Sequence, residues 1–270
     1  MAFLRKKQTD CGYVKSRYKL GLALSGGGTR GFAHLGVLKA FAEHRIRFDY
    51  VTGTSAGSLV GAIYCAEANL DDVIAEARTV TRKELVNRRF AVGSNSANIQ
   101  RLAERFLQGK TFDDLKIPFA CVAVDIKSGS EVILNRGDVS QAVAASCAVP
   151  ALFTPVAMDG MLLVDGGLLN NMPADVCRRM GADIVIGVDL NHTRGQGTKS
   201  AKLLDTLIAT WNITTKSTMY KGQINSDLVI EPELKIYKNT SLDSIDERIE
   251  EGYKAAVKVM DEIKQLILAK

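Results

Sequence analysis

Two kinds of hydrophobic pattern alternate along the first part of the chain. Residues 18–25 and 48–53 are short, mostly apolar segments of strand length. Residues 30–44 place apolar side chains at positions 32, 35, 38 and 41, the spacing of one helix face, and residues 56–68 indicate a helix buried on most sides. This strand–helix–strand–helix order is typical of a parallel sheet covered by helices. The expected fold class is therefore α/β.

The pattern continues to the end of the chain. Further strands are predicted over residues 118–126, 129–135, 183–190 and 226–232, with the second of these pairing with the first. A hairpin is predicted within residues 156–167, where Asp159-Gly160 stands between apolar residues. Further helices are predicted over residues 70–80, 98–108, 172–180 and 244–268. No repeat or low-complexity linker marks a boundary, so we expect a single domain over residues 19–270 after a basic extension at residues 1–18.

Composition and charge refine this expectation. The 270 residues are 46% hydrophobic and 24% charged, which is ordinary for a globular protein with a sizeable core. The net charge of +5 conceals two basic segments, residues 1–20 with +5 and residues 78–110 with +6. Either segment could face an anionic membrane, and residues 78–110 are also a candidate lid. Solvated helix faces and a basic tail explain the same charges equally well. We expect no nucleic-acid partner.

The number and spacing of the cysteines and the lengths of the apolar segments bear on the cellular compartment of the protein. Five cysteines are scattered without a C-x-x-C pair, and this odd number argues against a disulfide framework. Cys65, Cys121 and Cys177 lie in apolar segments and are expected in the core. The N-terminus lacks the apolar region of a signal peptide, and residues 139–158, though uncharged, are interrupted by prolines. We expect a cytoplasmic protein, with peripheral membrane contact as an addition.

The segment "GTSAG", residues 53–57, has the spacing of a nucleophile elbow. Ser55 stands between a predicted strand and a predicted helix, flanked by Gly53 and Gly57 two residues away on either side. A nucleophile at such a sharp turn needs small neighbours, and the helix start supplies unpaired N–H groups. The alternative is an ordinary glycine-rich turn in which Ser55 caps the helix.

A second glycine-rich turn, "GGGTRG", follows the first predicted strand. Gly26, Gly27 and Gly28 could supply backbone N–H donors to a developing oxyanion, and Arg30 adds positive charge nearby. The turn also matches G-x-G-x-x-G through Gly31, so a nucleotide-binding or phosphate-binding domain is an alternative. The nucleotide interpretation needs an acidic residue at the end of the second strand, whereas Asp49 lies near its beginning.

The base that would deprotonate Ser55 is less obvious, because the chain has three histidines. His34 and His44 precede the nucleophile, and His192 lies in a polar loop where a solvated side chain is the simpler interpretation. Asp165 is the better candidate: it ends an apolar strand and is followed by Gly166 and Gly167. Burial would have to raise its pKa to make it an effective base. The alternative is an ordinary turn aspartate.

Four blocks, in order, resemble the bacterial patatin-like phospholipases: "GGGTRG" (26–31), "GTSAG" (53–57), "ASCAVPALFTP" (145–155) and "DGG" (165–167). The resemblance covers residues 19–265. It implies a three-layer fold with a mostly parallel sheet between helices, Ser55 as nucleophile and Asp165 as its base without a catalytic histidine. The oxyanion region would be Gly26, Gly27 and Gly28 with the turn to Arg30. Phospholipids or lysophospholipids would be hydrolysed without calcium or any other metal or cofactor.

Other functions remain open at this point. A soluble esterase, a thioesterase or an acyltransferase could use the same Ser55 nucleophile. A non-catalytic phosphate-binding domain could use the loop of residues 26–31. Val149, Leu152 and Phe153 could line an acyl channel, although core packing would explain them equally well.

Overall fold

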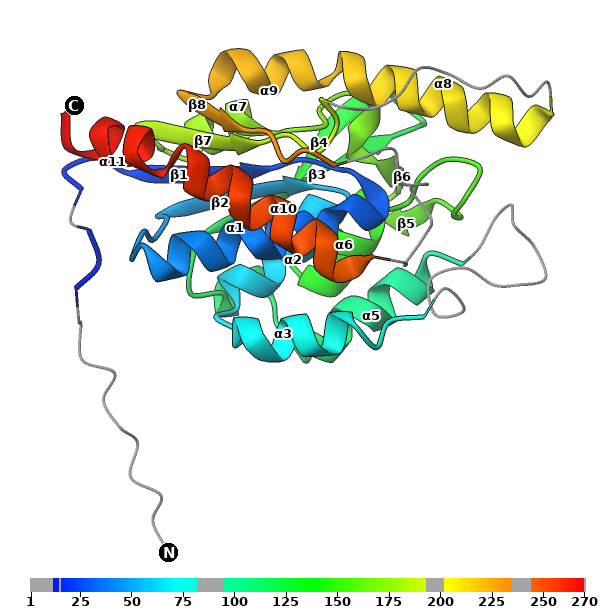
Figure 1. Ribbon diagram of the computed structural model, residues 1–270. Helices are drawn as coiled ribbons and strands as arrows, with labels where there is room; N and C mark the ends of the chain where they lie inside the picture. The colour runs from blue at the N-terminus through cyan, green and yellow to red at the C-terminus, as the bar shows by residue number, and fades with distance from the viewer. Residues whose placement is uncertain (1–11, 15, 82–94, 193–201, 235–243, 270) are drawn as a thin grey trace, which may run out of the picture.

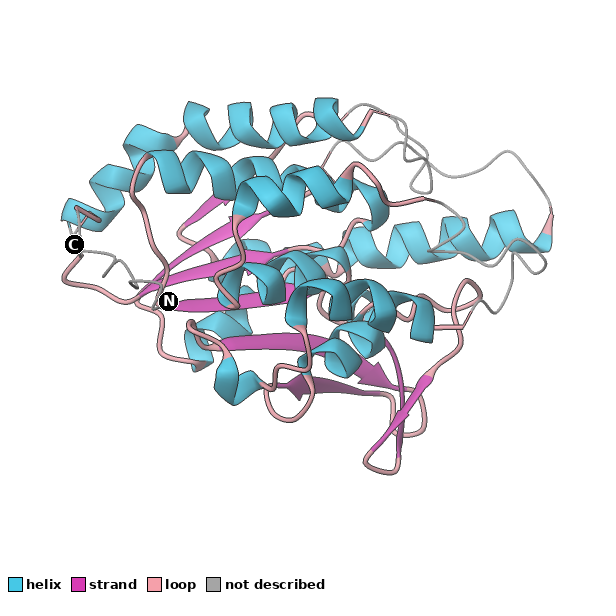
Figure 2. Cartoon of the chain, turned by 90° about the horizontal axis from the view of Figure 1, so that it is seen from below, coloured by secondary structure: helices cyan, strands magenta, loops and turns pink. Residues whose placement is uncertain are grey.

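The computed structural model places the strands of the chain in one sheet between two layers of helices (Figures 1 and 2). It describes residues 12–14, 16–81, 95–192, 202–234 and 244–269. Within these residues the sheet has eight strands in the order β5-β6-β3-β2-β1-β7-β8, and β4 pairs with β3 outside this path. The strands are β1 (Leu20–Leu24), β2 (Tyr50–Thr54), β3 (Phe119–Asp125), β4 (Ser130–Leu134), β5 (Val156–Met158), β6 (Met161–Asp165), β7 (Ile184–Val188) and β8 (Leu228–Ile230).

Most neighbouring strands run parallel. β1 pairs in parallel with β2 and β7, β2 with β3, and β7 with β8. β4 and β6 run antiparallel to β3, and β5 runs antiparallel to β6. The predicted hairpin is confirmed, since Met158 pairs with Met161 around Asp159 and Gly160, which both have positive φ. The predicted α/β class with a mostly parallel sheet is also confirmed.

Helices cover both faces of this sheet (Figure 1). The side of α2 carries α1 (Phe32–Glu43), α2 (Ala56–Cys65), α3 (Leu70–Ala77), α5 (Ala97–Leu107), α6 (Val139–Ser146) and α10 (Ile245–Lys258). The opposite side carries α7 (Ala174–Arg179) and α9 (Met219–Asn225), with α8 (Leu203–Ser217) leading into α9. Helix α11 (Met260–Ala269) ends the described chain. Short 3₁₀ helices lie at η1 (Gly28–Gly31), η2 (Phe112–Asp114) and η3 (Gly166–Leu168).

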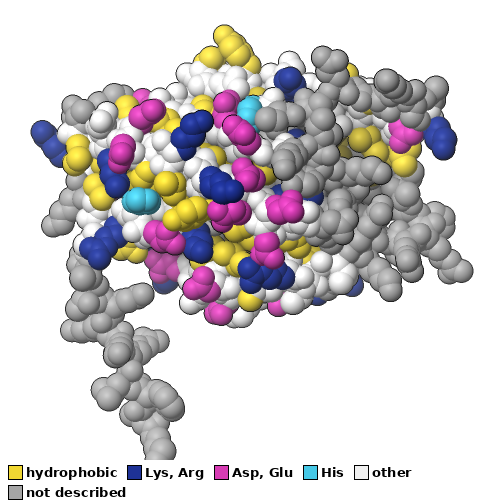
Figure 3. Space-filling view, viewed as in Figure 1, with side chains coloured by type: hydrophobic (Ala, Val, Ile, Leu, Met, Phe, Trp, Pro, Cys, Tyr) yellow, Lys and Arg dark blue, Asp and Glu magenta, His cyan; other side chains and the backbone are white. Residues whose placement is uncertain are grey.

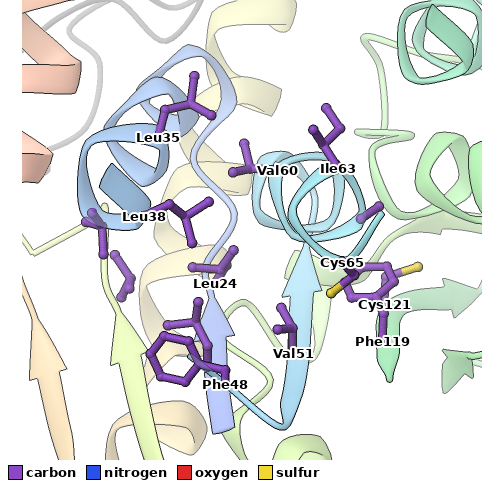
Figure 4. Packing of buried hydrophobic residues seen from close by; sticks show 14 of the residues in the cluster. Leu24, Leu35, Leu38, Phe48, Val51, Val60, Ile63, Cys65, Phe119 and Cys121 are labelled. Atoms are coloured by element: carbon purple, nitrogen blue, oxygen red, sulfur yellow. The ribbon is translucent and has the colours of Figure 1, made fainter. Parts of the chain in front are cut away.

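Side chains of the strands alternate between two cores. Leu22 and Leu24 of β1 belong to the large apolar cluster that packs under α1 and α2 (Figure 4). Ala23, between them, points to the other face and packs with Cys177 of α7. Small residues on that face let α7 lie close to the sheet, and a methyl group added at Gly21 would overlap the Cys177 sulfur.

The structure departs from the predicted elements in two places. The single helix predicted over residues 244–268 is interrupted at Val259, so that α10 and α11 are separate helices. Because a one-residue interruption leaves the apolar spacing almost unchanged, periodicity alone does not reveal it. Helices α6, α8 and α9 had no sequence prediction. Helix α6 lies in an alanine-rich stretch without apolar periodicity, and α8 carries threonines, which are weak helix formers.

The expectation about the core cysteines is confirmed. Cys65, Cys121 and Cys177 are buried and free, as is Cys147. Among the described residues, no helix has both the length and the apolar character needed to cross a membrane. Most of the basic extension at residues 1–18 lies outside the described residues, so the division at residue 18 stays a prediction.

Helices α1 and α10 touch through their backbones at two glycines. A methyl group at Gly36 would overlap the carbonyl oxygen of Ile249, and one at Gly252 would overlap the carbonyl oxygen of Ala33. Both carbonyls are backbone groups, so neither can move aside as the end of a flexible side chain could. The contact therefore fixes α10 against α1 and closes this side of the molecule.

We expect Gly36→Ala and Gly252→Ala each to lower the free energy of unfolding by ~1–3 kcal/mol, because the added methyl separates the two helices. This loss should outweigh the ~1 kcal/mol that alanine gains in helix propensity. Urea unfolding measures the difference. The exposed Lys258→Ala on α10 is the control and should stay within ~0.5 kcal/mol of the parent protein. A Gly36→Ala variant as stable as the parent would contradict the close contact.

Candidate active site

The register of the sheet brings Ser55 and Asp165 to the same place. Thr54, the last residue of β2, pairs with Val122 of β3, and Ser55 follows directly. The next residue of β3, Ala123, pairs with Asp165 at the end of β6. β4 pairs along one edge of β3. On the other edge, β2 pairs with β3 as far as Val122, and β6 pairs with β3 from Ala123 onward. Two residues that are 110 positions apart in the chain thus become neighbours at one edge of the sheet.

Ser55 sits in a strained elbow between β2 and α2. Its backbone has φ of 53° and ψ of −124°, a conformation that non-glycine residues rarely adopt and that costs ~1–3 kcal/mol. The turn is tight enough that a methyl group at Gly53 would overlap the Gly57 carbonyl, and one at Gly57 would overlap the Leu24 carbonyl. Both glycines of the predicted elbow are therefore required by close backbone approach, and Ser55 is held at the corner of the turn, where it is 8% exposed.

Ser146 holds the elbow from the side. The Ser55 N–H donates to Ser146 Oγ at 3.0 Å, and Ser146 Oγ donates to the Val122 carbonyl at 2.7 Å. Both groups are buried, so each would be costly to leave without a partner. Ser146 is therefore a positioning residue. It lies in the block of residues 145–155, whose pattern predicts no role for Ser146.

Asp165 is fully buried and poised between its two protonation states. Gly167 N–H donates to Asp165 Oδ1 at 2.8 Å, while Oδ2 has no hydrogen bond of ordinary geometry to a described residue. Burial raises the pKa of Asp165 from 3.8 to about 7, and interactions with the Ser55 hydroxyl and the Gly167 N–H oppose this rise. Gly166 packs so closely on the Val122 carbonyl that a side chain there would overlap it. The sequence-predicted aspartate thus has the pKa that a base needs near neutral pH.

The glycine turn after β1 lies against the elbow. A methyl group at Gly26 would come within 3.0 Å of Ser55 Cβ, so the two turns are in contact. The Gly26 N–H donates to the Asn171 carbonyl at 3.0 Å, whereas the N–H groups of Gly27 and Gly28 have no hydrogen bond to another described residue. Of the three predicted oxyanion donors, Gly27 and Gly28 are therefore the available ones.

Arg30 supports this turn from behind rather than facing the cavity as a free cation. It is 3% exposed, and its guanidinium donates to Asn191 Oδ1 at 2.9 Å and to the Gly27 carbonyl at 3.4 Å. Burial lowers the pKa of Arg30 to about 10, so it stays charged at neutral pH. Asn191 also donates through Nδ2 to the Gly26 carbonyl at 2.7 Å. No sequence pattern points to Asn191 or Asn171, because they become partners of the turn only through the fold.

None of the three histidines lines the cavity that contains Ser55 and Asp165. His34 is fully buried in α1, its Nε2 contacts the Ser25 carbonyl at 2.8 Å, and burial lowers its pKa to about 4. His44 contacts Lys264 at the far end of α1. His192 follows β7 and does not line the cavity that contains Ser55.

The nucleotide-binding interpretation does not fit the geometry. Asp49 lies at the beginning of β2, where its carboxylate accepts the Leu20 N–H at 2.9 Å and pairs with Lys19 at 2.8 Å. This end of the sheet is opposite to the Gly26–Gly28 turn. Among the described residues there is also no group of three or more His, Cys, Asp or Glu side chains arranged to hold a metal ion.

An apolar cavity of about 260 Å³ opens onto the Ser55–Asp165 pair. One end is formed by the glycine turn, Ser55, Asp165 and Cys147. Its walls come from α2, α3, α5 and α8 and include Val149, Leu152 and Phe153, the residues predicted for an acyl channel. Burial raises the pKa of the Cys147 thiol, so this sulfur stays neutral and does not compete as a nucleophile.

The segment of residues 78–110, predicted as a lid or membrane-facing region, is described only in part. Residues 82–94 lie outside the described residues. Helix α5 directs Ile99, Leu102 and Phe106 into the cavity, and its outer side carries exposed Arg101 and Arg105. The described part of this segment is therefore a cavity wall, while the lid and the membrane contact stay predictions.

We expect Asp165→Asn to be more stable than the parent protein, by an amount that grows from pH 4 to pH 7. The folded state holds the carboxyl group protonated up to about pH 7, whereas the unfolded chain ionises it near 3.8. Folding the parent protein therefore becomes more costly across this range, and asparagine removes a cost of ~2–4 kcal/mol above pH 7. Urea unfolding at several pH values measures the gain.

Asp125→Asn is the matched control with the opposite sign. Asp125 accepts the Leu162 N–H at 3.0 Å, which together with the Ser128 hydroxyl lowers its pKa. Its replacement should therefore lose stability at pH 8. A gain that does not depend on pH in Asp165→Asn would show that burial does not shift this carboxyl group.

Comparisons with known proteins agree with this architecture. The chain is 35% identical over 181 residues to patatin-like phospholipase domain-containing protein 6 of Mus musculus, covering 63% of this chain and 13% of that protein. It is 32% identical over 191 residues to an uncharacterized NTE family protein of Mycobacterium tuberculosis, covering 68% of this chain and 52% of that protein. The chain thus spans about half, or much less, of the length of these relatives. The crystal structure of VipD from Legionella pneumophila shares the fold, with a TM-score of 0.64 at 14% identity over 95% of this chain and 69% of that one.

A sequence profile of the patatin-like phospholipase family matches residues 22–178, which contain both glycine turns, Ser55, Ser146 and Asp165. The chain belongs to the patatin-like phospholipase family.

Proposed function

We propose that the protein is a serine acyl-ester hydrolase that acts on phospholipids or lysophospholipids through Ser55 and Asp165. The observation that carries the proposal is a fully buried carboxyl group with a pKa of about 7 beside a strained serine, at the end of an apolar cavity. A base poised near neutral pH, a nucleophile at an elbow and an apolar acyl site are the parts this reaction needs.

The first half of the reaction forms an acyl-enzyme. Ser55 Oγ attacks the ester carbonyl carbon as its proton passes to Asp165 Oδ2. The N–H groups of Gly27 and Gly28 hold the negative oxygen of the tetrahedral intermediate, with no side chain in the way. The bond to the alcohol then breaks, and the proton on Asp165 goes to the leaving alcohol oxygen.

The second half uses the same groups with water. Asp165 takes a proton from a water molecule as its oxygen attacks the acyl carbon, and the proton returns to Ser55 Oγ when the fatty acid leaves. His34, His44 and His192 take no part. Ser146 and Gly167 keep the nucleophile and the base in place through their hydrogen bonds.

The apolar lining of the cavity favours a lipid over a small polar ester. Phe106, Leu152 and Phe153 are among the apolar side chains that line it beyond Ser55, so a long acyl chain would bury much apolar surface there. The names of the relatives, a phospholipase-domain protein and members of the NTE family, support this substrate class.

A soluble esterase, a thioesterase or an acyltransferase would use the same Ser55. A cytoplasmic location with peripheral contact to an anionic membrane remains part of the proposal.

We expect a fluorophosphonate probe to label Ser55 in the parent protein and not in Ser55→Ala. Asp165→Asn should lower hydrolysis of phospholipid vesicles at least ~100-fold, because the serine then lacks its base. His192→Ala is the matched control and should change the rate less than ~3-fold, since this side chain does not line the cavity. Mass spectrometry of the labelled peptide and fatty-acid release measure these effects. An inactive His192→Ala with an active Asp165→Asn would overturn the dyad.

The pH dependence follows from the state of Asp165. As a base it must be unprotonated, and its pKa is raised to about 7. We therefore expect kcat/KM for a soluble ester to fall ~tenfold per pH unit below pH 7 and to level off above it. Rates between pH 5 and pH 9 provide the test. A rate that stays constant down to pH 5 would contradict a base of this pKa.

A further inference from the structure

Helix α8, which lines part of the cavity, projects from one end of the molecule. Figures 1 and 2 show it running beyond the sheet. Of the residues in α8, Thr215 is buried, and the others are half-buried or exposed. Its C-terminal end is fixed to the catalytic turn, because Thr218 Oγ1 donates to the Gly167 carbonyl at 2.8 Å and Asn171 Nδ2 donates to the Thr215 carbonyl at 3.2 Å.

The two sides of α8 are both apolar, but only one of them has a partner. Ile208, Trp211 and Thr215 on the inner side line the cavity. On the outer side, Leu203, Leu207 and Ile213 are 76%, 45% and 65% exposed. Figure 3 shows hydrophobic side chains reaching the surface at the projecting end of this helix.

The outer side of α8 is also free of charge. We define the outer α8 face as Leu203, Thr206, Leu207, Thr210, Ile213, Thr214 and Ser217, which fall within about 120° of the helix circumference. The charged residues of the helix, Asp205 and Lys216, lie outside this sector. An exposed helix of a water-facing surface normally carries charged side chains there.

The threonines of this face satisfy their own hydroxyl groups. Thr206, Thr210 and Thr214 each donate to the carbonyl oxygen four residues earlier, at 3.1, 3.0 and 3.1 Å. Each hydroxyl is thereby paired within the helix. This pattern suits an environment that offers no hydrogen bonds, such as the interior of a bilayer.

We propose that the outer α8 face is a bilayer-docking surface that holds the cavity mouth against the membrane. The helix has 15 residues and is about 22 Å long, too short to span a bilayer but suited to lie within its interface. Helix α5, on the other wall of the cavity, uses its apolar side for the cavity and keeps Arg101 and Arg105 outside. Of these two walls, α8 is the one with apolar side chains left for a lipid surface.

Docking through this face would place a membrane next to the route into the site. Because Ile208 and Trp211 of the same helix line the cavity, a lipid leaving the bilayer beside α8 would meet apolar side chains along its way to Ser55. This part of the proposal, the delivery of substrate, rests on the proposed function. Binding of α8 to a bilayer does not depend on it.

The binding test uses Ser55→Ala protein, so that vesicles are not hydrolysed, and co-sedimentation with phosphatidylcholine vesicles. We expect Leu203→Gln/Leu207→Gln to lower the partition coefficient at least ~tenfold, since glutamine preserves the helix and removes the apolar contact. The matched control is Leu268→Gln/Val257→Gln on α11 and α10, near the opposite end of the molecule, where the side chains are 71% and 39% exposed. It should change binding less than ~twofold. Raising the salt from ~0.1 to ~0.5 M should have little effect, because the outer α8 face carries no charge.

Hydrolysis assays with vesicles and with a soluble ester distinguish an effect on membrane docking from an effect on catalysis. In a chain with Ser55 intact, Leu203→Gln/Leu207→Gln should slow hydrolysis of phosphatidylcholine vesicles and leave that of a short-chain soluble ester within ~twofold. If the parent protein hydrolyses neither, the proposed function fails and the co-sedimentation result alone decides the docking proposal. Equal vesicle binding by both double variants would overturn it. So would a dimer that the α8 variant converts to monomers in analytical ultracentrifugation, because the outer α8 face would then bind a second copy of the chain.

Discussion

The arrangement of the site depends on the burial of one carboxyl group, Asp165. Its position follows from β6 replacing β2 beside β3, a register that places the carboxyl group next to Ser55 and away from water. Burial alone would make the charged form so costly that Asp165 stayed protonated, and the Ser55 hydroxyl and the Gly167 N–H bring the pKa back to about 7. The same burial that costs stability would therefore prepare Asp165 for its proposed role as the base.

The neighbouring turns are held by polar groups that the proposed reaction does not consume. The Ser55 N–H donates to the Ser146 hydroxyl oxygen, and the Gly26 N–H donates to the Asn171 carbonyl. Asn191 accepts a hydrogen bond from Arg30 and donates one to the Gly26 carbonyl. With the Gly26 amide occupied, the donors left for an oxyanion are Gly27 and Gly28. Arg30 thus braces the turn through the Gly27 carbonyl and Asn191, and its proposed contribution to the oxyanion region is the positive charge that it places nearby.

Much of the fold could be predicted from the sequence, because the hydrophobic periodicity of strands and helices depends on residues close together in the chain. The strands around Ser55, the hairpin at Asp159-Gly160 and the helix after the elbow were all predictable from spacing and turn residues. Ser55 and Asp165 were recognisable because glycines mark the tight turns around them. Ser146, Asn171 and Asn191 were not, since their hydrogen bonds join residues far apart in the chain and any polar side chain looks alike before folding. Helix α8 was missed for a related reason: its threonines and outward-facing leucines do not form the usual amphipathic pattern.

The central claim is that the fold holds Asp165 as a carboxyl group with a pKa near neutrality. Carbon-13 NMR of protein labelled at the aspartate carboxyl carbons measures this directly, with the Asp165 resonance assigned by its absence from Asp165→Asn. We expect that resonance to titrate with a midpoint near pH 7. A midpoint below ~5, close to an ordinary aspartate, would contradict the account.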